Sequence, residues 1–203
     1  MARPTVFVVD DNPGVRTGVQ ALVEADGLAV ETYASAQEFL DAYDAERPGC
    51  LVLDIRLRGS SGLDLQDELR KRKAILPIIM LTAYGNVSTA VRAFKGGAVD
   101  FLQKPVAPEK LLKCIRDAIE TDQRARNAAA TRLAVIERIE QLTPREREVM
   151  ELLLLGKISK EIASALDLSV RTVEGHRREV LRKMKVSSAA ELVRAVVDAR
   201  SDA

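Results

Sequence analysis

The 203-residue chain has no tryptophan, one histidine and two cysteines. Its seven aromatic residues, three Tyr and four Phe, argue against a protein built on aromatic cages or stacked bases. The single histidine, His176, leaves too few ligands for a histidine-rich zinc site. Cys50 and Cys114 do not have the spacing of a metal site. Because there are only these two lone cysteines, we expect no disulfide framework and a protein of the reducing cytoplasm.

Long apolar runs are also absent. Stretches such as Leu152–Leu155 are far shorter than the roughly 20 residues that a membrane helix requires. The run Thr5–Val9 near the N-terminus is cut by Asp10 and Asp11, which is not the pattern of a signal peptide. We therefore expect a cytoplasmic protein with no membrane partner.

The formal net charge of +1 conceals a difference between the two parts of the chain. Residues 1–125 contain 16 basic and 18 acidic side chains, giving −2, whereas residues 126–203 contain 15 and 12, giving +3. Residues 157–185 alone contain 8 basic and 4 acidic side chains, giving +4. This distribution indicates two domains with different partners.

The first 120 residues alternate between short apolar runs and helical patterns. The strands that this pattern predicts are Thr5–Val9, Leu28–Tyr33, Cys50–Leu53, Pro77–Leu81 and Val99–Leu102. The predicted helices cover residues 13–26, 35–46, 62–72, 86–96 and 108–121. Five such repeats predict a doubly wound α/β fold, with a parallel sheet covered on both faces.

Polar residues follow these predicted strands and should meet at one edge of the sheet, where doubly wound folds bind ligands. The residues are Asp10, Asp11, Asp54, Thr82 and Lys104. Three converging carboxylates favour a bound Mg²⁺, while Lys104 and Thr82 suit phosphoryl oxygens. Asp54 is the best candidate for a carboxylate that accepts a phosphoryl group. A single Asp or Thr at a strand end is commonly a helix cap, but the combined set is hard to explain in that way.

Residues 4–121 resemble the receiver domain of two-component response regulators, through Asp10-Asp11, Asp54, Thr82-Ala83, Phe101 and Lys104-Pro105. The resemblance implies a flavodoxin-like sheet of strand order 2-1-3-4-5 and a cis bond before Pro105. It implies Mg²⁺ held by Asp11, Asp54 and the backbone carbonyl of Arg56, with Asp10 in support. It also implies that Thr82 and Phe101 change position together when Asp54 is phosphorylated.

The chain departs from that family at one position near the acidic residues. Receiver domains usually have Pro-Gly where this chain has Arg58-Gly59. Proline stiffens a loop, so its absence leaves open the rigidity of this loop and the lifetime of the phosphate. The phosphoryl chemistry itself is unaffected.

From residue 121 the strand pattern disappears. Residues 122–141 lack Pro and Gly and are predicted to form a helical linker, either a dimerising or packing helix or a simple spacer. Residues 142–203 contain four capped helical segments, beginning after Thr143, Ser159, Ser169 and Ser188. The second and third form a helix-turn-helix pattern, so this part is predicted to be an all-α DNA-binding domain.

The segment Thr143–Val196 resembles the output domain of the NarL/LuxR/FixJ class, through Leu142-Thr-Pro-Arg-Glu-Arg-Glu-Val, Ile162-Ala, Leu168-Ser and Arg171-Thr-Val-Glu-Gly-His. The resemblance implies that the helix after Ser169 enters the major groove. Base contacts would come from Glu174, Gly175 and Arg178. Candidate phosphate contacts are Lys160, Arg171, Thr172, Arg177 and Lys183. His176 is expected to pack beneath this helix.

Together the two resemblances predict a FixJ-type transcriptional response regulator. A histidine kinase would phosphorylate Asp54, and the phosphorylated chain would form a homodimer and bind promoter DNA. RNA polymerase is a further candidate partner. We expect no enzymatic activity beyond phosphoryl transfer to Asp54 and its reversal.

Two alternatives belong to other classes of protein. Mg²⁺-dependent phosphatases also use an Asp nucleophile, but they place the second acid two residues later, and Asp10-Asp11-Asn12 does not fit. A constitutive DNA-binding module with a purely structural receiver is the second alternative, and Arg58 leaves it open. Dependence of DNA affinity on phosphorylation distinguishes it from a switch.

Overall fold

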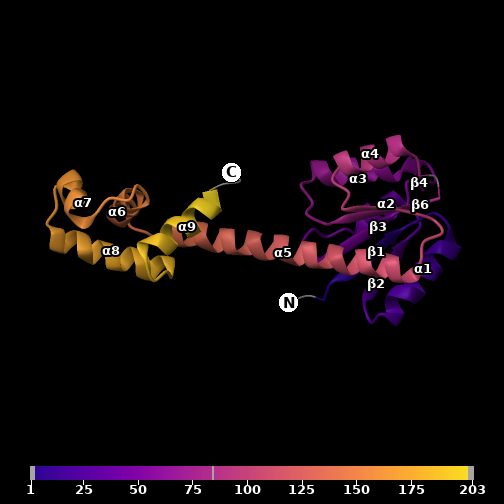
Figure 1. Cartoon of the computed structure of the whole chain (residues 1–203), viewed down its shortest axis with the longest axis horizontal. Coiled ribbons are helices and arrows are strands. Elements are labelled where there is room, and N and C mark those ends of the chain that lie inside the picture. The colour runs from indigo at the N-terminus through magenta and orange to yellow at the C-terminus, as the bar shows by residue number, and fades with distance from the viewer. Residues whose placement is uncertain (1–2, 84, 201–203) are drawn as a thin grey trace. The chain divides into compact units, whose positions relative to one another are not determined.

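A computed structural model describes residues 3–83 and 85–200 and divides the chain into two compact units, Met1–Arg126 and Asn127–Ala203 (Figure 1). The boundary lies five residues beyond residue 121, where the receiver domain is predicted to end. It falls inside one long helix, α5 (Pro108–Glu140), which contributes residues to both units.

The first unit is built on a parallel five-stranded sheet of order β2-β1-β3-β6-β7. Counted within this sheet alone, that is the predicted order 2-1-3-4-5. The strands are β1 (Thr5–Val9), β2 (Ala29–Tyr33), β3 (Gly49–Leu53), β6 (Ile78–Thr82) and β7 (Asp100–Gln103). Each begins within one residue of its predicted start, because each apolar run is bounded by polar or turn residues.

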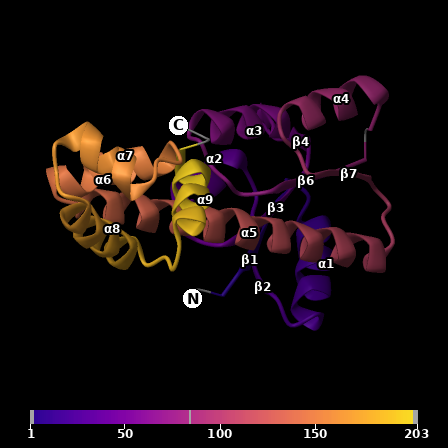
Figure 2. The same cartoon turned by 60° about the vertical axis from the view of Figure 1, so that its left-hand side comes forward.

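Helices cover both faces of this sheet (Figure 2). One face packs against α1 (Pro13–Ala25) and the first part of α5, through residues such as Val8, Val23 and Ile115. The other packs against α2 (Ala36–Ala42), α3 (Gly62–Lys71) and α4 (Val87–Lys95), around Phe39 and Leu51. The central strands are buried on both faces, as their continuous apolar runs predict.

A small hairpin that the sequence pattern did not predict follows β3. It consists of β4 (Arg56–Leu57) and β5 (Ser60–Ser61), paired antiparallel. Gly59 at its tip has φ +78°, a value that glycine adopts without strain. The backbone N–H of Gly62 donates to the Ile55 carbonyl at 2.8 Å and closes the base of the hairpin.

Helix α5 is anchored in the first unit by a buried carboxylate, Asp122. Its Oδ2 accepts a hydrogen bond from the backbone N–H of Gly49 at 2.9 Å, and Arg126 Nε donates to both oxygens at 2.9 Å. Farther along, Val135 is buried in the core of the second unit. The predicted linker of residues 122–141 is therefore helical to Glu140 and takes part in the packing of both units.

The second unit contains, after α5, the helices α6 (Pro144–Leu154), α7 (Ser159–Leu166), α8 (Val170–Met184) and α9 (Ala189–Arg200). Thr143 and Glu146 form the predicted capping box, and Ser169 caps α8 as predicted. Ser159 is not the N-cap of α7, because that position is held by Ile158. The backbone N–H of Ile158 donates a hydrogen bond to the Glu161 carboxylate. Residues 201–203 of the predicted DNA-binding domain lie outside the described residues.

None of the helices in the described part of the chain combines the length and apolar composition needed to span a bilayer.

Candidate functional site

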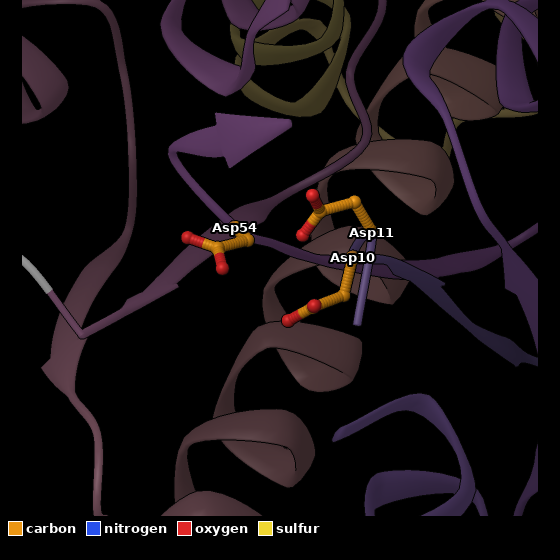
Figure 3. Close-up of side chains that lie close together, drawn as sticks. All are labelled: Asp10, Asp11 and Asp54. Atoms are coloured by element: carbon orange, nitrogen blue, oxygen red, sulfur yellow. The ribbon is translucent and has the colours of Figure 1, made fainter. Parts of the chain in front are cut away.

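The first candidate site lies at the carboxyl edge of the sheet. Asp10 and Asp11 follow β1, and Asp54 follows β3. Figure 3 shows these three side chains gathered at neighbouring strand ends, and one oxygen of each lies within 4.8 Å of the others. Asp11 and Asp54 line an open pocket with Asn12, Val15, Arg56, Leu57, Ala83 and Lys104, whereas Asp10 is almost fully buried.

Lys104 follows β7 and joins two of the three carboxylates. Its Nζ lies 2.5 Å from Asp10 Oδ2 and 2.8 Å from Asp54 Oδ2. Burial disfavours the ammonium group, but the hydrogen bonds and charges of Asp10 and Asp54 outweigh it and raise the pKa of Lys104. Lys104 therefore stays protonated and holds a positive charge beside the candidate nucleophile.

Backbone donors fix the remaining oxygens of these carboxylates. The N–H of Asn12 donates to Asp10 Oδ1 at 2.9 Å, and that of Arg56 donates to Asp54 Oδ1 at 3.2 Å. Asn12 also caps α1, which orients the loop that carries Asp10 and Asp11. The role of the Arg56 carbonyl as a metal ligand stays a prediction.

The chemistry of this donor set fits Mg²⁺. Carboxylate oxygens facing an open pocket are the hard ligands that this ion prefers, and an open site leaves room for water and a phosphoryl oxygen. Asp11 and Asp54 would provide direct ligands and Asp10 would support them. A bound Mg²⁺ would neutralise the carboxylates and the charge of an incoming phosphoryl group.

The two predicted switch residues lie on adjacent strands. Thr82 ends β6 and is fully buried, whereas Phe101 on β7 is partly buried against the core that contains Met80. A Cβ on Gly85 would lie 3.0 Å from the Phe101 ring, so a larger residue at 85 would require the ring to shift by a few tenths of an ångström. This contact between Gly85 and Phe101 cannot be predicted from the sequence, because it arises only from packing.

Arg58 at the tip of the hairpin reaches back to the acidic residues. Its Nε lies 3.5 Å from Asp11 Oδ2, while 85% of its side chain stays exposed. The sequence identified Arg58 only by the missing proline, and its ion pair depends on how the hairpin folds. This contact adds a second cation beside the three carboxylates.

The second candidate site, in the other unit, is the outer face of α8 together with Lys160 on α7. Lys160, Arg171, Thr172, Gly175 and Arg178 are exposed, as a DNA-contacting surface requires. The hydroxyl of Thr172 also lies 2.7 Å from Ser169 Oγ at the start of the helix. These residues stay candidates for contacts to phosphates and bases.

Three other predicted contact residues have partners inside the domain. Lys183 Nζ lies 2.6 Å from the buried carboxylate of Glu146, which favours a structural role over a phosphate contact. Glu174 accepts a hydrogen bond from the hydroxyl of Ser159 at the start of α7. Arg177 Nη1 lies 3.4 Å from the same hydroxyl. The sequence could not show these pairings, because their partners lie on other helices.

Gly175 is explained by no neighbour within the described chain. A Cβ at this position would meet no atom within 4 Å, so no other helix requires glycine there. A close contact with another helix is therefore excluded as the reason for Gly175, as far as the described residues show. The predicted close approach of Gly175 to DNA is compatible with this open space and stays a prediction.

Comparisons with known proteins agree with this geometry. Residues 6–116 match the family model of the response regulator receiver domain, and residues 140–196 match that of bacterial regulatory proteins of the luxR family. The chain is 40% identical to the response regulator protein TodT of Pseudomonas putida, over 93% of this chain and 83% of that one. It is 38% identical to the transcriptional regulatory protein FixJ of Bradyrhizobium diazoefficiens, over 93% and 92% of the two chains.

Solved structures give the same result. The response regulator StyR matches with a TM-score of 0.86 and 39% identity, covering 96% of this chain and 98% of StyR. Full-length FixJ from B. japonicum matches with a TM-score of 0.61 and 37% identity, covering 98% of both chains. The chain therefore belongs to the two-component response regulators, as a transcriptional regulator with a receiver domain and a LuxR-type DNA-binding domain.

Proposed function

We propose that a histidine kinase phosphorylates this regulator on Asp54 in the presence of Mg²⁺, and that phosphorylation promotes dimerisation and promoter binding. The observation that carries the proposal is the pair of short contacts from Lys104 to Asp10 and Asp54 at the pocket edge. They place a fixed cation beside a carboxylate that is only 8% exposed but lines an open pocket.

In the proposed step, an oxygen of Asp54 attacks phosphorus of the phosphohistidine. The new O–P bond forms as the P–N bond breaks, and the electron pair stays on the imidazole nitrogen, which takes up a proton. Lys104 stabilises the charge on one phosphoryl oxygen, and the hydroxyl of Thr82 donates a hydrogen bond to another. The buried position of Thr82 means that it must shift to do so, and Phe101 moves with it.

The proposed output is DNA binding through α8. Lys160, Arg171 and Thr172 contact phosphates, while Gly175 and Arg178 approach the bases. Glu174 positions α8 against α7 through Ser159, and Arg177 shares that hydroxyl. The proposal places the protein in the cytoplasm with its DNA, and it includes RNA polymerase as a further partner. It includes no enzymatic activity on other substrates.

Phosphorylation can be tested by incubating the full chain with Mg²⁺ and acetyl phosphate and measuring its intact mass. We expect wild type to gain one phosphoryl group and Asp54→Asn to gain none. Asp64→Asn is the matched control, because Asp64 lies on the exposed surface of α3 and should leave labelling unchanged. Labelling of Asp54→Asn to the wild-type extent would contradict the proposal.

A further inference from the structure

The hairpin that carries Arg58 is held in a fixed position beside the acidic site. A Cβ on Gly62 would lie 2.1 Å from the carbonyl oxygen of Asp54, so the base of the hairpin is in close backbone contact with the phosphoacceptor residue. The Ile55 carbonyl accepts the N–H of Gly62 at 2.8 Å and the hydroxyl of Ser61 at 3.3 Å. This anchoring keeps the tip of the hairpin, and with it Arg58, within reach of Asp11.

The two cations of the site divide the three carboxylates between them. Lys104 contacts Asp10 and Asp54, whereas Arg58 contacts Asp11. Three carboxylates and two cations carry a formal charge of −1. A divalent ion added to that set would give the site a formal charge of +1. With Arg58 withdrawn, the same site has a formal charge of −2, and Mg²⁺ would bring it to zero.

The two cations differ in how readily they can leave. The side chain of Lys104 is 17% exposed and is held by two short contacts, whereas that of Arg58 is 85% exposed and makes a longer one. An exposed ion pair contributes little stability, so Arg58 can move into solvent at small cost.

We propose that Arg58 competes with Mg²⁺ for Asp11, so that the chain binds the ion more weakly than it would with an uncharged residue at position 58. This inference rests on the proposed function, because it takes Asp11 as a ligand of the ion. It gives the residue that replaces the usual proline a specific role. Arg58 lowers the occupancy of the metal site and thereby raises the Mg²⁺ concentration needed for phosphorylation.

The test is the dissociation constant of Mg²⁺ alone, measured by calorimetry on the full-length chain without a phosphoryl donor. Arg58→Gln removes the charge, Arg58→Pro removes it while stiffening the turn, and Arg58→Lys keeps it. Arg70→Gln is the matched control, because it removes the same net charge as Arg58→Gln. Arg70 is an exposed arginine on α3 that pairs with Asp67.

We expect Arg58→Gln and Arg58→Pro to bind Mg²⁺ about two- to fivefold more tightly than wild type, the range that an exposed ion pair provides. Arg58→Lys and Arg70→Gln should stay near wild type. The gain should shrink as KCl is raised, because salt screens exposed charges.

Equal dissociation constants for wild type and Arg58→Gln would overturn the inference. An equal gain in Arg58→Lys would also overturn it, because charge would then not be the cause. If neither wild type nor any variant bound Mg²⁺, both this inference and the metal site of the proposed function would fail. If wild type and Arg58→Gln bound Mg²⁺ with equal dissociation constants, only the role of Arg58 would be removed.

Discussion

At the scale of single residues, burial decides which charged pairs matter in this chain. Helix α6 begins with two ion pairs of the same length, 2.6 Å, between Glu146 and Lys183 and between Glu148 and Arg145. The Glu146 side chain is 7% exposed and that of Glu148 is 50% exposed. Water can replace the partner of Glu148, but it cannot readily reach Glu146.

We therefore expect Glu146→Gln to destabilise the DNA-binding unit by about 1–3 kcal/mol, because the buried Lys183 contact and the capping box are both weakened. The exposed control, Glu148→Gln, should cost about 1 kcal/mol or less. Urea unfolding followed by circular dichroism at neutral pH measures both. Equal destabilisation by the two variants would show that burial does not distinguish the pairs.

The same residue predicts a pH dependence. Burial raises the pKa of Glu146. The hydrogen bonds from Lys183 and Thr143 have a larger effect in the opposite direction, so the net pKa lies below its ordinary value of 4.5. A lowered folded-state pKa means that Glu146 stabilises the fold above pH 4.5 and that this stability is lost as the pH falls through the lowered value. The stability difference between wild type and Glu146→Gln should therefore narrow below pH 4.5 in the same urea experiment.

At the scale of helices and strands, the sequence predicted what depends on local pattern. The five strands of the main sheet were located because each is a short apolar run that polar or turn residues bound. The hairpin of β4 and β5 was missed because strands of two residues carry no periodic pattern. Its position depends on the close approach of Gly62 to Asp54, which becomes visible only in the fold.

The same reasoning applies to the candidate sites. Asp10, Asp11, Asp54 and Lys104 were found because strand ends in a parallel sheet meet at one edge. The internal partners of Glu174 and Lys183 could not be found in this way. They lie 15 and 37 positions away along the chain, and only the packing of α8 against α6 and α7 brings them together.

For helix α8, a single substitution separates stability from DNA contact. Gly175→Ala should raise the melting temperature of the DNA-binding unit, because alanine favours a helix by about 1 kcal/mol over glycine and its methyl group meets no atom within 4 Å. The same methyl group should weaken promoter binding if the backbone approaches DNA closely. Thermal unfolding and a DNA titration on the same variant give both values.

A higher melting temperature with unchanged DNA affinity would show that position 175 lies away from the DNA. Ala190→Ser, at an exposed position of α9, keeps the charge and is a control that should leave the affinity near wild type.

At the scale of the whole molecule, one helix takes part in both units. Near its start, α5 contributes Leu111 and Ile115 to the core against the sheet, and near its end it contributes Val135 to the core of the DNA-binding unit. Asp122 fixes its middle to Gly49 at the start of β3, the strand that precedes Asp54. Helix α5 thus carries both an anchor beside β3 in the first unit and a core residue of the DNA-binding unit.

The central claim is that phosphorylation of Asp54 controls DNA binding. The most direct measurement is DNA affinity and oligomer size of the full chain at fixed salt, with a promoter pool as bait, in the presence and absence of Mg²⁺ and acetyl phosphate. We predict that affinity and dimer fraction rise together in wild type and that neither rises in Asp54→Asn. Equally tight binding in every condition would contradict the claim and would make the chain a constitutive DNA-binding protein.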